Sequence, residues 1–244
     1  MWNPDQFEFI SGKTPLSSIE FVIFISLIHL IITIILEFWM KTRSKAFNIR
    51  NIQRYNNLLI GLFSATIFLL INIFAYRDKR FVSFDKLLCH RTRPKGIYAF
   101  LWYFFYLSKL WEFLDIYFVI LNKSPILFHF RWHHQTTPSV VLFGLIGDIG
   151  YEWATILSNL LMHIILYPHF AGIWNGGVLL LIFGALQLCV GLSFSLYSLF
   201  IGCSGSFYAQ LWGLFMYITY TIGYLNEHFH FFDHFLLLIF KKKK

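Results

Sequence analysis

Residues 20–40 read EFVIFISLIHLIITIILEFWM, and no charged residue falls between Glu20 and Glu37. A helix rises about 1.5 Å per residue, so about 20 apolar residues cross the ~30 Å hydrocarbon layer of a membrane. The chain of 244 residues is 57% hydrophobic, 21% aromatic and 13% charged, whereas a typical soluble domain has about 25% charged residues. The sequence therefore indicates a polytopic membrane protein. It excludes a disordered chain, a disulfide-rich secreted scaffold and an ordinary cytosolic enzyme.

Apolar runs separated by polar breaks predict seven helices in a single all-α domain that covers residues 1–244. The net charge of +8 does not indicate a nucleic-acid partner, because the basic residues border the apolar runs, where they would contact lipid headgroups. No basic stretch precedes a short apolar run at the start, so we expect no cleaved signal peptide. The predicted helices lie at about 20–40, 56–76, 97–121, 125–147, 150–172, 174–200 and 207–240.

The last four residues, Lys241 to Lys244, match the dilysine retrieval signal of endoplasmic reticulum membrane proteins, or they simply end the last helix. A cytosolic signal and seven spans predict a luminal N-terminus and a cytosolic C-terminus, although the basic loop after the second helix then runs against the positive-inside tendency. Cys89 and Cys203 fall in two loops on the same, oxidising side. We expect either a disulfide between them or two unrelated thiols.

Ionisable side chains inside the predicted helices converge on one layer. Counted from the cytosolic ends at 1.5 Å per residue, they lie at depths of about 9–18 Å. Such groups are costly in a membrane interior and usually mark a functional site. The layer contains Glu112, Asp115, His133, His134, His163, His228 and His230.

Several of these residues also have a purely structural interpretation. The charged residues of KLWEFLD at 109–115 follow i, i+3 spacing, which suits a neutralising ladder within one helix. Asn159 and His163 follow i, i+4 spacing, which suits hydrogen bonds between helices. The histidines of the last helix lie near a membrane boundary, and His29 is expected to be a packing residue.

Four motifs occur in a fixed order in the second half of the chain. KLWEFLD at 109–115 is followed by His133-His134, by NLLMHIILY at 159–167 and by Gln187. In this order and spacing they resemble the KxxExxDT, HxxHH, NxxxHxxMY and QxxQ motifs of the ELO family of very-long-chain fatty acid elongases. Tyr224 and the aromatic residues at 231–232 are similar to the family's last motif.

The resemblance implies an all-α membrane protein of about seven transmembrane helices enclosing an acyl-chain tunnel, located in the endoplasmic reticulum. It implies a 3-ketoacyl-CoA synthase that condenses malonyl-CoA with a long-chain acyl-CoA, releases CO₂ and CoA, and needs no metal or other cofactor. The implied partners are these two substrates, membrane lipid and the other enzymes of the elongation cycle. Homo-oligomerisation is left open.

No cysteine lies in the polar layer, so we expect His133 to accept the acyl group as an acyl-imidazole. His134 and His163 would stabilise an oxyanion or move protons. Glu112 and Asp115 would orient the imidazoles. The expected supporting residues are His129, Lys109, Asn159, Tyr167, Gln187 and His230, and the expected contacts with CoA phosphates are Lys123 and Arg131.

The sequence departs from the family pattern at the histidine box. Phe130 stands where the first histidine of HxxHH belongs, and His129 lies one place earlier, four residues before His133. Val190 replaces the second glutamine of QxxQ, and Pro168 interrupts the aromatic run after the NxxxHxxMY-like motif.

Two other classes of protein remain as alternatives. A membrane di-iron desaturase or hydroxylase is one, because residues 129–134 form an HxxxHH pattern, but the chain has no second adjacent histidine pair. A non-catalytic lipid-binding or transport protein is the other, although the sequence shows no inverted repeats and no pair of helices broken by glycine or proline.

Overall fold

The computed structural model describes residues 4–89, 95–203 and 205–241. Its regular structure in these ranges is helical, apart from an isolated bridge between Glu8 and Lys95. The α-helices are α1 (Ile19–Thr42), α2 (Arg50–Arg77), α3 (Phe84–Leu88), α4 (Gly96–Trp111), α5 (Phe113–Leu121), α6 (Phe128–Gly147), α7 (Glu152–Phe170), α8 (Gly177–Ile201) and α9 (Phe207–Lys241), with short 3₁₀ helices η1 (Pro4–Gln6) and η2 (Arg80–Val82).

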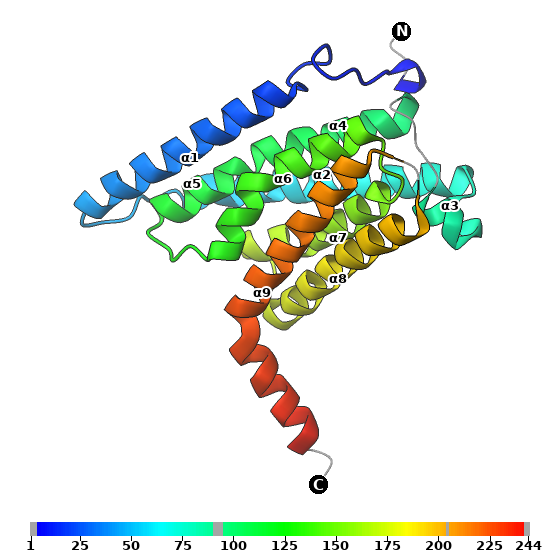
Figure 1. The fold of residues 1–244 in the computed structure, drawn as a ribbon. Helices are drawn as coiled ribbons and strands as arrows, with labels where there is room; N and C mark the ends of the chain where they lie inside the picture. Colours follow the sequence, from blue (N-terminus) through cyan, green and yellow to red (C-terminus); the bar gives the residue numbers. More distant parts are fainter. Residues whose placement is uncertain (1–3, 90–94, 204, 242–244) are drawn as a thin grey trace.

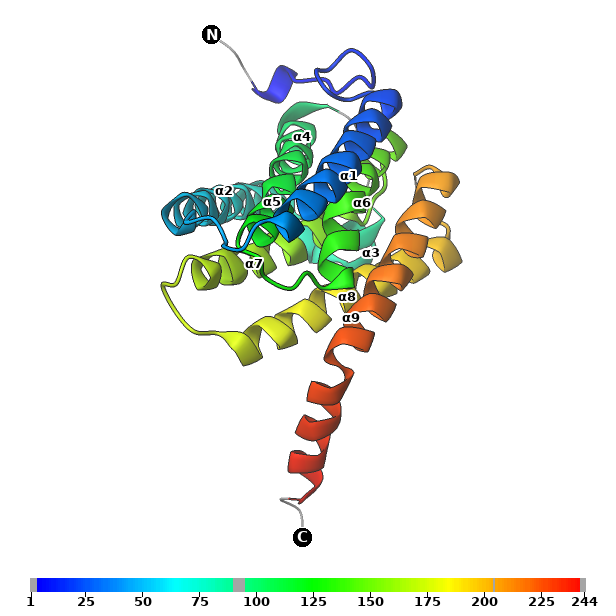
Figure 2. The same ribbon diagram turned by 90° about the vertical axis from the view of Figure 1, so that its left-hand side faces the viewer.

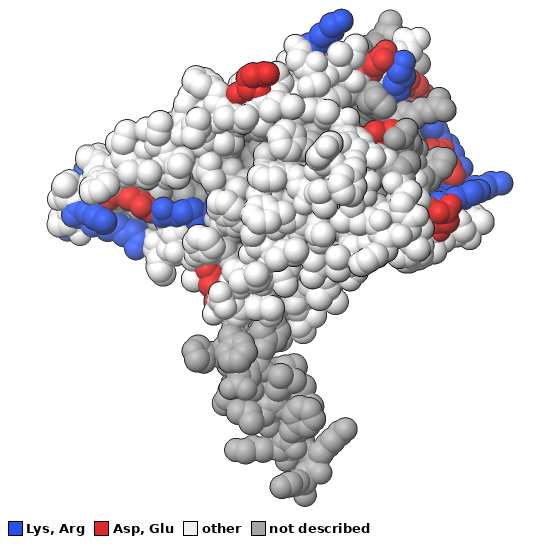
Figure 3. Space-filling model, in the orientation of Figure 1, with Lys and Arg blue, Asp and Glu red and all other residues white. Residues whose placement is uncertain are grey.

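The outer surface of the bundle is that of a membrane protein. Among the described helices, α1, α2 and α8 are long and apolar enough to cross a membrane. Large apolar side chains such as Phe38, Leu62 and Phe200 project from them and are exposed. Figure 3 shows charged side chains gathered towards the ends of the visible face, with a broad uncharged surface between them. The prediction of an all-α membrane protein is confirmed.

Six helices form a closed ring. Each contacts the next in the order α2, α7, α8, α9, α6 and α4, and α4 returns to α2. Helix α1 lies outside this ring against α5 and α6 (Figures 1 and 2). Helices α2 and α7 pack closely at Gly61, where a Cβ would be in van der Waals contact with the Cβ of Tyr167 at 3.4 Å. The ring encloses the space in which the predicted polar layer lies.

The helices follow the predicted order, but α2 begins at Arg50 and not at 56, the short helix α3 was not predicted, and two further helices differ locally. The helix predicted at 97–121 is divided at Glu112, which separates α4 from α5. The helix predicted to begin at residue 125 begins at Phe128, because Lys123 adopts a left-handed conformation (φ +55°) that turns the chain between the antiparallel helices α5 and α6.

The two ends of the ring differ. At one end, where α6 and α8 finish and α7 and α9 begin, Cys89 and Cys203 form a disulfide; we call this the disulfide end. The opposite end, where α2, α6 and α8 begin and α7 finishes, contains the mouths of the cavities described below. We call it the open end.

Candidate functional site

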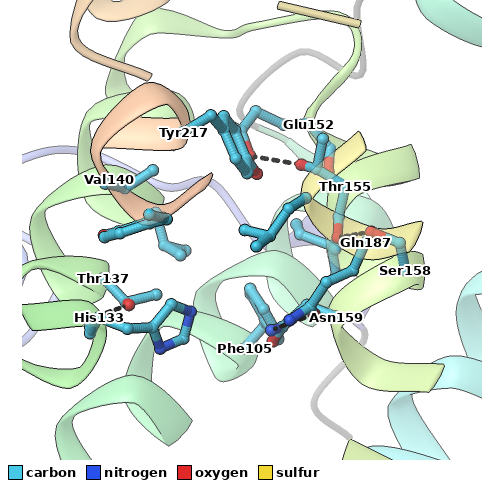
Figure 4. Close-up of a pocket in the computed structure, with 14 residues that line it drawn as sticks. Phe105, His133, Thr137, Val140, Glu152, Thr155, Ser158, Asn159, Gln187 and Tyr217 are labelled. Carbon is cyan, nitrogen blue, oxygen red and sulfur yellow. Dashed lines mark hydrogen bonds between the residues drawn. The ribbon is translucent and has the colours of Figure 1, made fainter. Parts of the chain in front are cut away.

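Two cavities inside the ring meet at His133. The deep cavity, of about 40 Å³, extends from His133 past Val140 to Glu152 and Tyr217 (Figure 4). The entrance cavity, of about 170 Å³, lies towards the open end between α6, α7, α8 and α9 and reaches Phe170 and His228. Three residues line both cavities: His133, Asn159 and Gln187.

The imidazole of His133 lines both cavities, and its ring nitrogens form no hydrogen bond with another described residue. In Figure 4 the ring points from α6 into the deep cavity, opposite Asn159 of α7. Its ring neighbours are Tyr220 of α9 at 5.0 Å and His134 at 5.6 Å between centroids. An imidazole without internal partners is free to react with a group that enters either cavity.

His134, in contrast, is held by the backbone. Its Nδ1 lies 3.0 Å from the carbonyl oxygen of Glu112, at the break between α4 and α5. A carbonyl only accepts, so Nδ1 must donate, and the neutral ring then carries its lone pair on Nε2. The break therefore sets the tautomer of His134.

The sequence around Pro138 shapes the turn of α6 that carries both histidines. Proline has no N–H to give to the carbonyl four residues earlier, which is that of His134. The hydroxyl of Thr136 donates to the carbonyl of Trp132 at 2.7 Å, and that of Thr137 donates to the carbonyl of His133. Threonine hydroxyls thus hydrogen-bond the backbone next to the reactive ring.

A chain of polar side chains links α4 to α7 and α8. The Nζ of Lys109 donates to Glu112 at 2.8 Å and to Oδ1 of Asn159 at 2.7 Å. The amide of Asn159 in turn donates to Gln187 at 3.3 Å. The side chains of Lys109 and Glu112 are almost fully buried. Each charge therefore needs the opposite charge beside it to offset the cost of burial. Of the i, i+3 ladder considered from the sequence, the Lys109–Glu112 pair is present and continues into the cavity wall, whereas Asp115 lies on α5 beyond the break.

The two carboxylates are held mainly by groups other than histidine. Asp115 accepts a hydrogen bond from the hydroxyl of Tyr167 at 2.7 Å, and its nearest approach to Nδ1 of His134 is 3.9 Å. Glu112 lies 3.7 Å from Nδ1 of His163, whose closer partner is the hydroxyl of Ser64 at 3.4 Å. Glu112 thus holds the imidazole of His134 through its backbone carbonyl, and its carboxylate lies beside the imidazole of His163.

His129 and Phe130 point to different neighbours. His129 lines the entrance cavity, its ring lies 5.9 Å from that of His133, and its backbone N–H donates to Glu227 of α9 at 2.8 Å. Phe130 packs on His134 with 4.4 Å between ring centroids. Phe130 therefore gives the site no first histidine of the HxxHH pattern. His129, one residue earlier, is the third histidine of this segment that lies in the site.

Two predicted basic contacts lie outside these cavities. Arg131 pairs with Glu37, and the Nζ of Lys123 donates to the carbonyl of Arg43, in a groove between α1, α5 and α6 at the open end. The side chain of His230 lies outside the described residues, as do residues 242–244 of the lysine tail. His29 is a packing residue as expected, because it stacks on Phe113 at 3.9 Å.

Sequence reasoning missed three contributors to the site. Tyr220 and Glu227 lie on the face of α9 that meets α6, where the spacing Tyr217, Tyr220, Tyr224 and Glu227 marks one side of a helix. Glu152 lines the deep cavity, and its Oε1 has no hydrogen-bond partner among the described residues. In that same part of the chain no group of three or more His, Cys, Asp or Glu is placed to hold a metal ion.

Comparisons with known proteins show the family of the chain. Residues 14–235 match the model of the ELO family, described as the GNS1/SUR4 family. The chain is 31% identical over 166 residues to "Fatty acid elongase A" of Dictyostelium discoideum, a match that covers 68% of this chain and 60% of that protein. It is 27% identical over 168 residues to "Fatty acid elongase sre1" of the same organism, covering 67% and 62%. The chain thus spans about three fifths of the length of these relatives. The match over most of its residues shows that the chain belongs to the ELO (GNS1/SUR4) family of fatty acid elongases.

Proposed function

We propose that the protein is a 3-ketoacyl-CoA synthase that condenses malonyl-CoA with a long-chain acyl-CoA. The observation that carries this proposal is the position of His133, an unpartnered imidazole where the entrance and deep cavities meet. The entrance cavity would admit the thioester from the open end, and the deep cavity would take the alkyl chain. The deep cavity is the smaller of the two, at about 40 Å³ against about 170 Å³.

In the first half-reaction, a ring nitrogen of His133 attacks the thioester carbonyl. The carbon–sulfur bond breaks, and CoA leaves as a thiol after taking up the proton that the imidazole loses. The product is an acyl-imidazole. Lys109 and Asn159, joined by a 2.7 Å hydrogen bond, anchor the cavity wall opposite His133.

In the second half-reaction, malonyl-CoA loses CO₂, and the electron pair of the broken carbon–carbon bond forms the thioester enolate. The enolate carbon attacks the acyl-imidazole carbonyl and the carbon–nitrogen bond breaks. The released ring nitrogen of His133 takes up a proton from water, which restores the neutral imidazole. His134 and His163 both line the entrance cavity. His163 would stabilise the enolate oxygen, and His134, whose Nε2 carries a lone pair, would move protons. The product is a 3-ketoacyl-CoA two carbons longer than the acyl substrate.

The same proposal places the protein in the endoplasmic reticulum membrane, with the open end and the C-terminus facing the cytosol. The disulfide end would then face the oxidising lumen. Lys123 and Arg131, at the open end, would contact CoA phosphates, and the other enzymes of the elongation cycle would use the product. In this mechanism side chains of the protein carry out both half-reactions, so the proposal includes no metal or other cofactor.

Labelled malonyl-CoA offered to the purified protein with acyl-CoAs of graded length tests this function. We expect release of CO₂ and a 3-ketoacyl-CoA product. Folded protein that binds acyl-CoA but forms no product across the series would favour a lipid-binding role. Two tightly bound iron atoms per chain would favour a desaturase or hydroxylase.

A further inference from the structure

A third cavity opens at the open end between α2, α5, α6 and α7. This side cavity has a volume of about 230 Å³ and is separate from the deep cavity. Its polar floor is formed by Gln53, Asn57 and Asp115, and its apolar wall includes Leu127, Phe130 and Phe170. Asp115 and the three wall residues also line the entrance cavity. The two mouths thus lead to the same carboxyl group from different sides.

Phe130 stands between the two mouths. Its ring packs on His134 and against the apolar cluster of Met40, Ile116 and Ile120. The entrance cavity continues past His133 into the deep cavity, whereas the side cavity shares no lining residue with the deep cavity. An alkyl chain that passes His133 therefore follows the first path, which leaves the side cavity for a second group.

The floor of the side cavity offers hydrogen-bond donors. Asn57 is 2% exposed, and its Nδ2 has no hydrogen-bond partner among the described residues. The Oε1 of Gln53 accepts from Asn122 at 2.6 Å, which leaves the Nε2 of Gln53 available to donate. A buried donor without a partner is unfavourable, so a ligand that brings an acceptor would satisfy it.

We propose that the side cavity binds the malonyl group of malonyl-CoA, whose carboxylate accepts hydrogen bonds from Asn57 and Gln53. The proposal rests on the proposed function and assigns its second substrate a site apart from the acyl chain. Loss of CO₂ turns a charged carboxylate into a neutral molecule, and the apolar wall of Leu127, Phe130 and Phe170 favours the neutral product. The remaining electron pair forms the enolate that attacks the acyl group.

The test separates the two half-reactions in the full-length purified protein. Release of CoA from acyl-CoA without malonyl-CoA reports acyl transfer, and the KM for malonyl-CoA reports the side cavity. We expect Asn57→Leu to raise that KM by about tenfold or more, the scale of a hydrogen bond to a charged group. Acyl transfer should stay within about twofold of the unmodified protein, because Asn57 does not line the deep or entrance cavity.

The neighbouring Asn56 provides the matched control. It is also buried, but its Oδ1 accepts from Nε1 of Trp111 at 2.9 Å and it does not line the side cavity. Asn56→Leu should leave the KM for malonyl-CoA unchanged. Asn57→Asp preserves the size of the side chain and places a negative charge before the carboxylate, so its KM should rise at least as far as that of Asn57→Leu.

The outcomes separate this proposal from the proposed function. Unmodified protein that neither releases CoA from acyl-CoA nor condenses would overturn the proposed function. The assignment of the side cavity would be overturned if the unmodified protein releases CoA and condenses, and Asn57→Leu and Asn57→Asp have the same KM for malonyl-CoA as the unmodified protein. An equal rise in the Asn56→Leu control would overturn it as well.

Discussion

The two ends of the helix ring are built in opposite ways. At the disulfide end, Cys89 and Cys203 are joined covalently, and the backbone packs so closely that a Cβ on Gly150 would lie 2.9 Å from the carbonyl carbon of Cys89. At the open end, the entrance and side cavities reach the surface between exposed residues such as Leu127 and Phe170. One end is closed by covalent and backbone contacts, and the other is left accessible.

This difference separates stability from chemistry along the length of one bundle. Groups that react or bind must be reached by substrate, so they lie near the cavities and leave some hydrogen-bonding capacity unused. Groups that hold the helices together can be fully packed. Substitutions at the open end should therefore change activity with little effect on stability, and substitutions at the disulfide end should do the reverse.

The largest effect is expected from His133→Ala. Removal of the proposed nucleophile should lower kcat/KM for condensation by about 10³-fold or more, with the thermal unfolding midpoint nearly unchanged. The measurement is product formation from labelled malonyl-CoA. His169→Ala is the control, because His169 is a histidine of another ring helix, α7, and lines none of the three cavities. Normal condensation by His133→Ala would contradict the mechanism.

Lys109 is expected to be an exception to this separation of stability from chemistry, because it lies next to the site and also supports the fold. Lys109→Met leaves Glu112 buried without its 2.8 Å partner, and loss of one member of a buried ion pair costs about 3–5 kcal/mol. Unfolding of the purified protein should show this loss. The double variant Lys109→Met/Glu112→Gln should recover most of the stability. A single variant as stable as the unmodified protein would show that the pair does not support the bundle.

At the disulfide end, replacing Cys89 and Cys203 together by serine should lower stability by about 2–5 kcal/mol. The disulfide spans 114 residues, so it restricts the unfolded chain strongly. Thermal unfolding checks the loss, and KM values measured at low temperature should stay the same. Cys189→Ser, at an exposed position of α8, is the control. If the double serine variant had a changed KM and unchanged stability, the disulfide end would serve the reaction and not the stability of the bundle.

The smallest effect is expected from Gly150→Ala. The new Cβ would meet backbone atoms of Leu88 and Cys89 at 2.9 Å, and overpacking of this kind costs about 1–3 kcal/mol. Gly177→Ala is the matched control, because a Cβ there meets nothing within 4 Å. Equal melting temperatures for the two variants would mean that the close packing at Gly150 relaxes without cost.

Sequence patterns predicted the fold well because apolar run length and polar breaks are local signals. The break at Glu112 was not predictable in this way, since residues 109–115 contain neither proline nor glycine. In the structure the carbonyl of Glu112 is used by His134 of another helix. A hydrogen-bond partner 22 residues away along the chain produces no pattern in the sequence around Glu112.

The site was predictable in its residue types and less so in its pairings. Histidines and carboxylates in apolar runs stand out, so His133 and Asp115 were found. The partner of Asp115 is Tyr167 at 2.7 Å, and Glu227 caps the start of α6 from α9. Such pairings depend on how the helices are arranged around the ring, which spacing along one helix does not encode.

Transfer of the acyl group to His133, at the junction of the entrance and deep cavities, is the central step of the proposed mechanism. Its most direct test is to incubate the purified protein with labelled acyl-CoA without malonyl-CoA and to locate the label by mass spectrometry. We predict one acyl group on His133 for each CoA released, and its transfer to the 3-keto product when malonyl-CoA is added. Release of the product without any acylated His133, or a label on another residue that transfers in its place, would contradict the account.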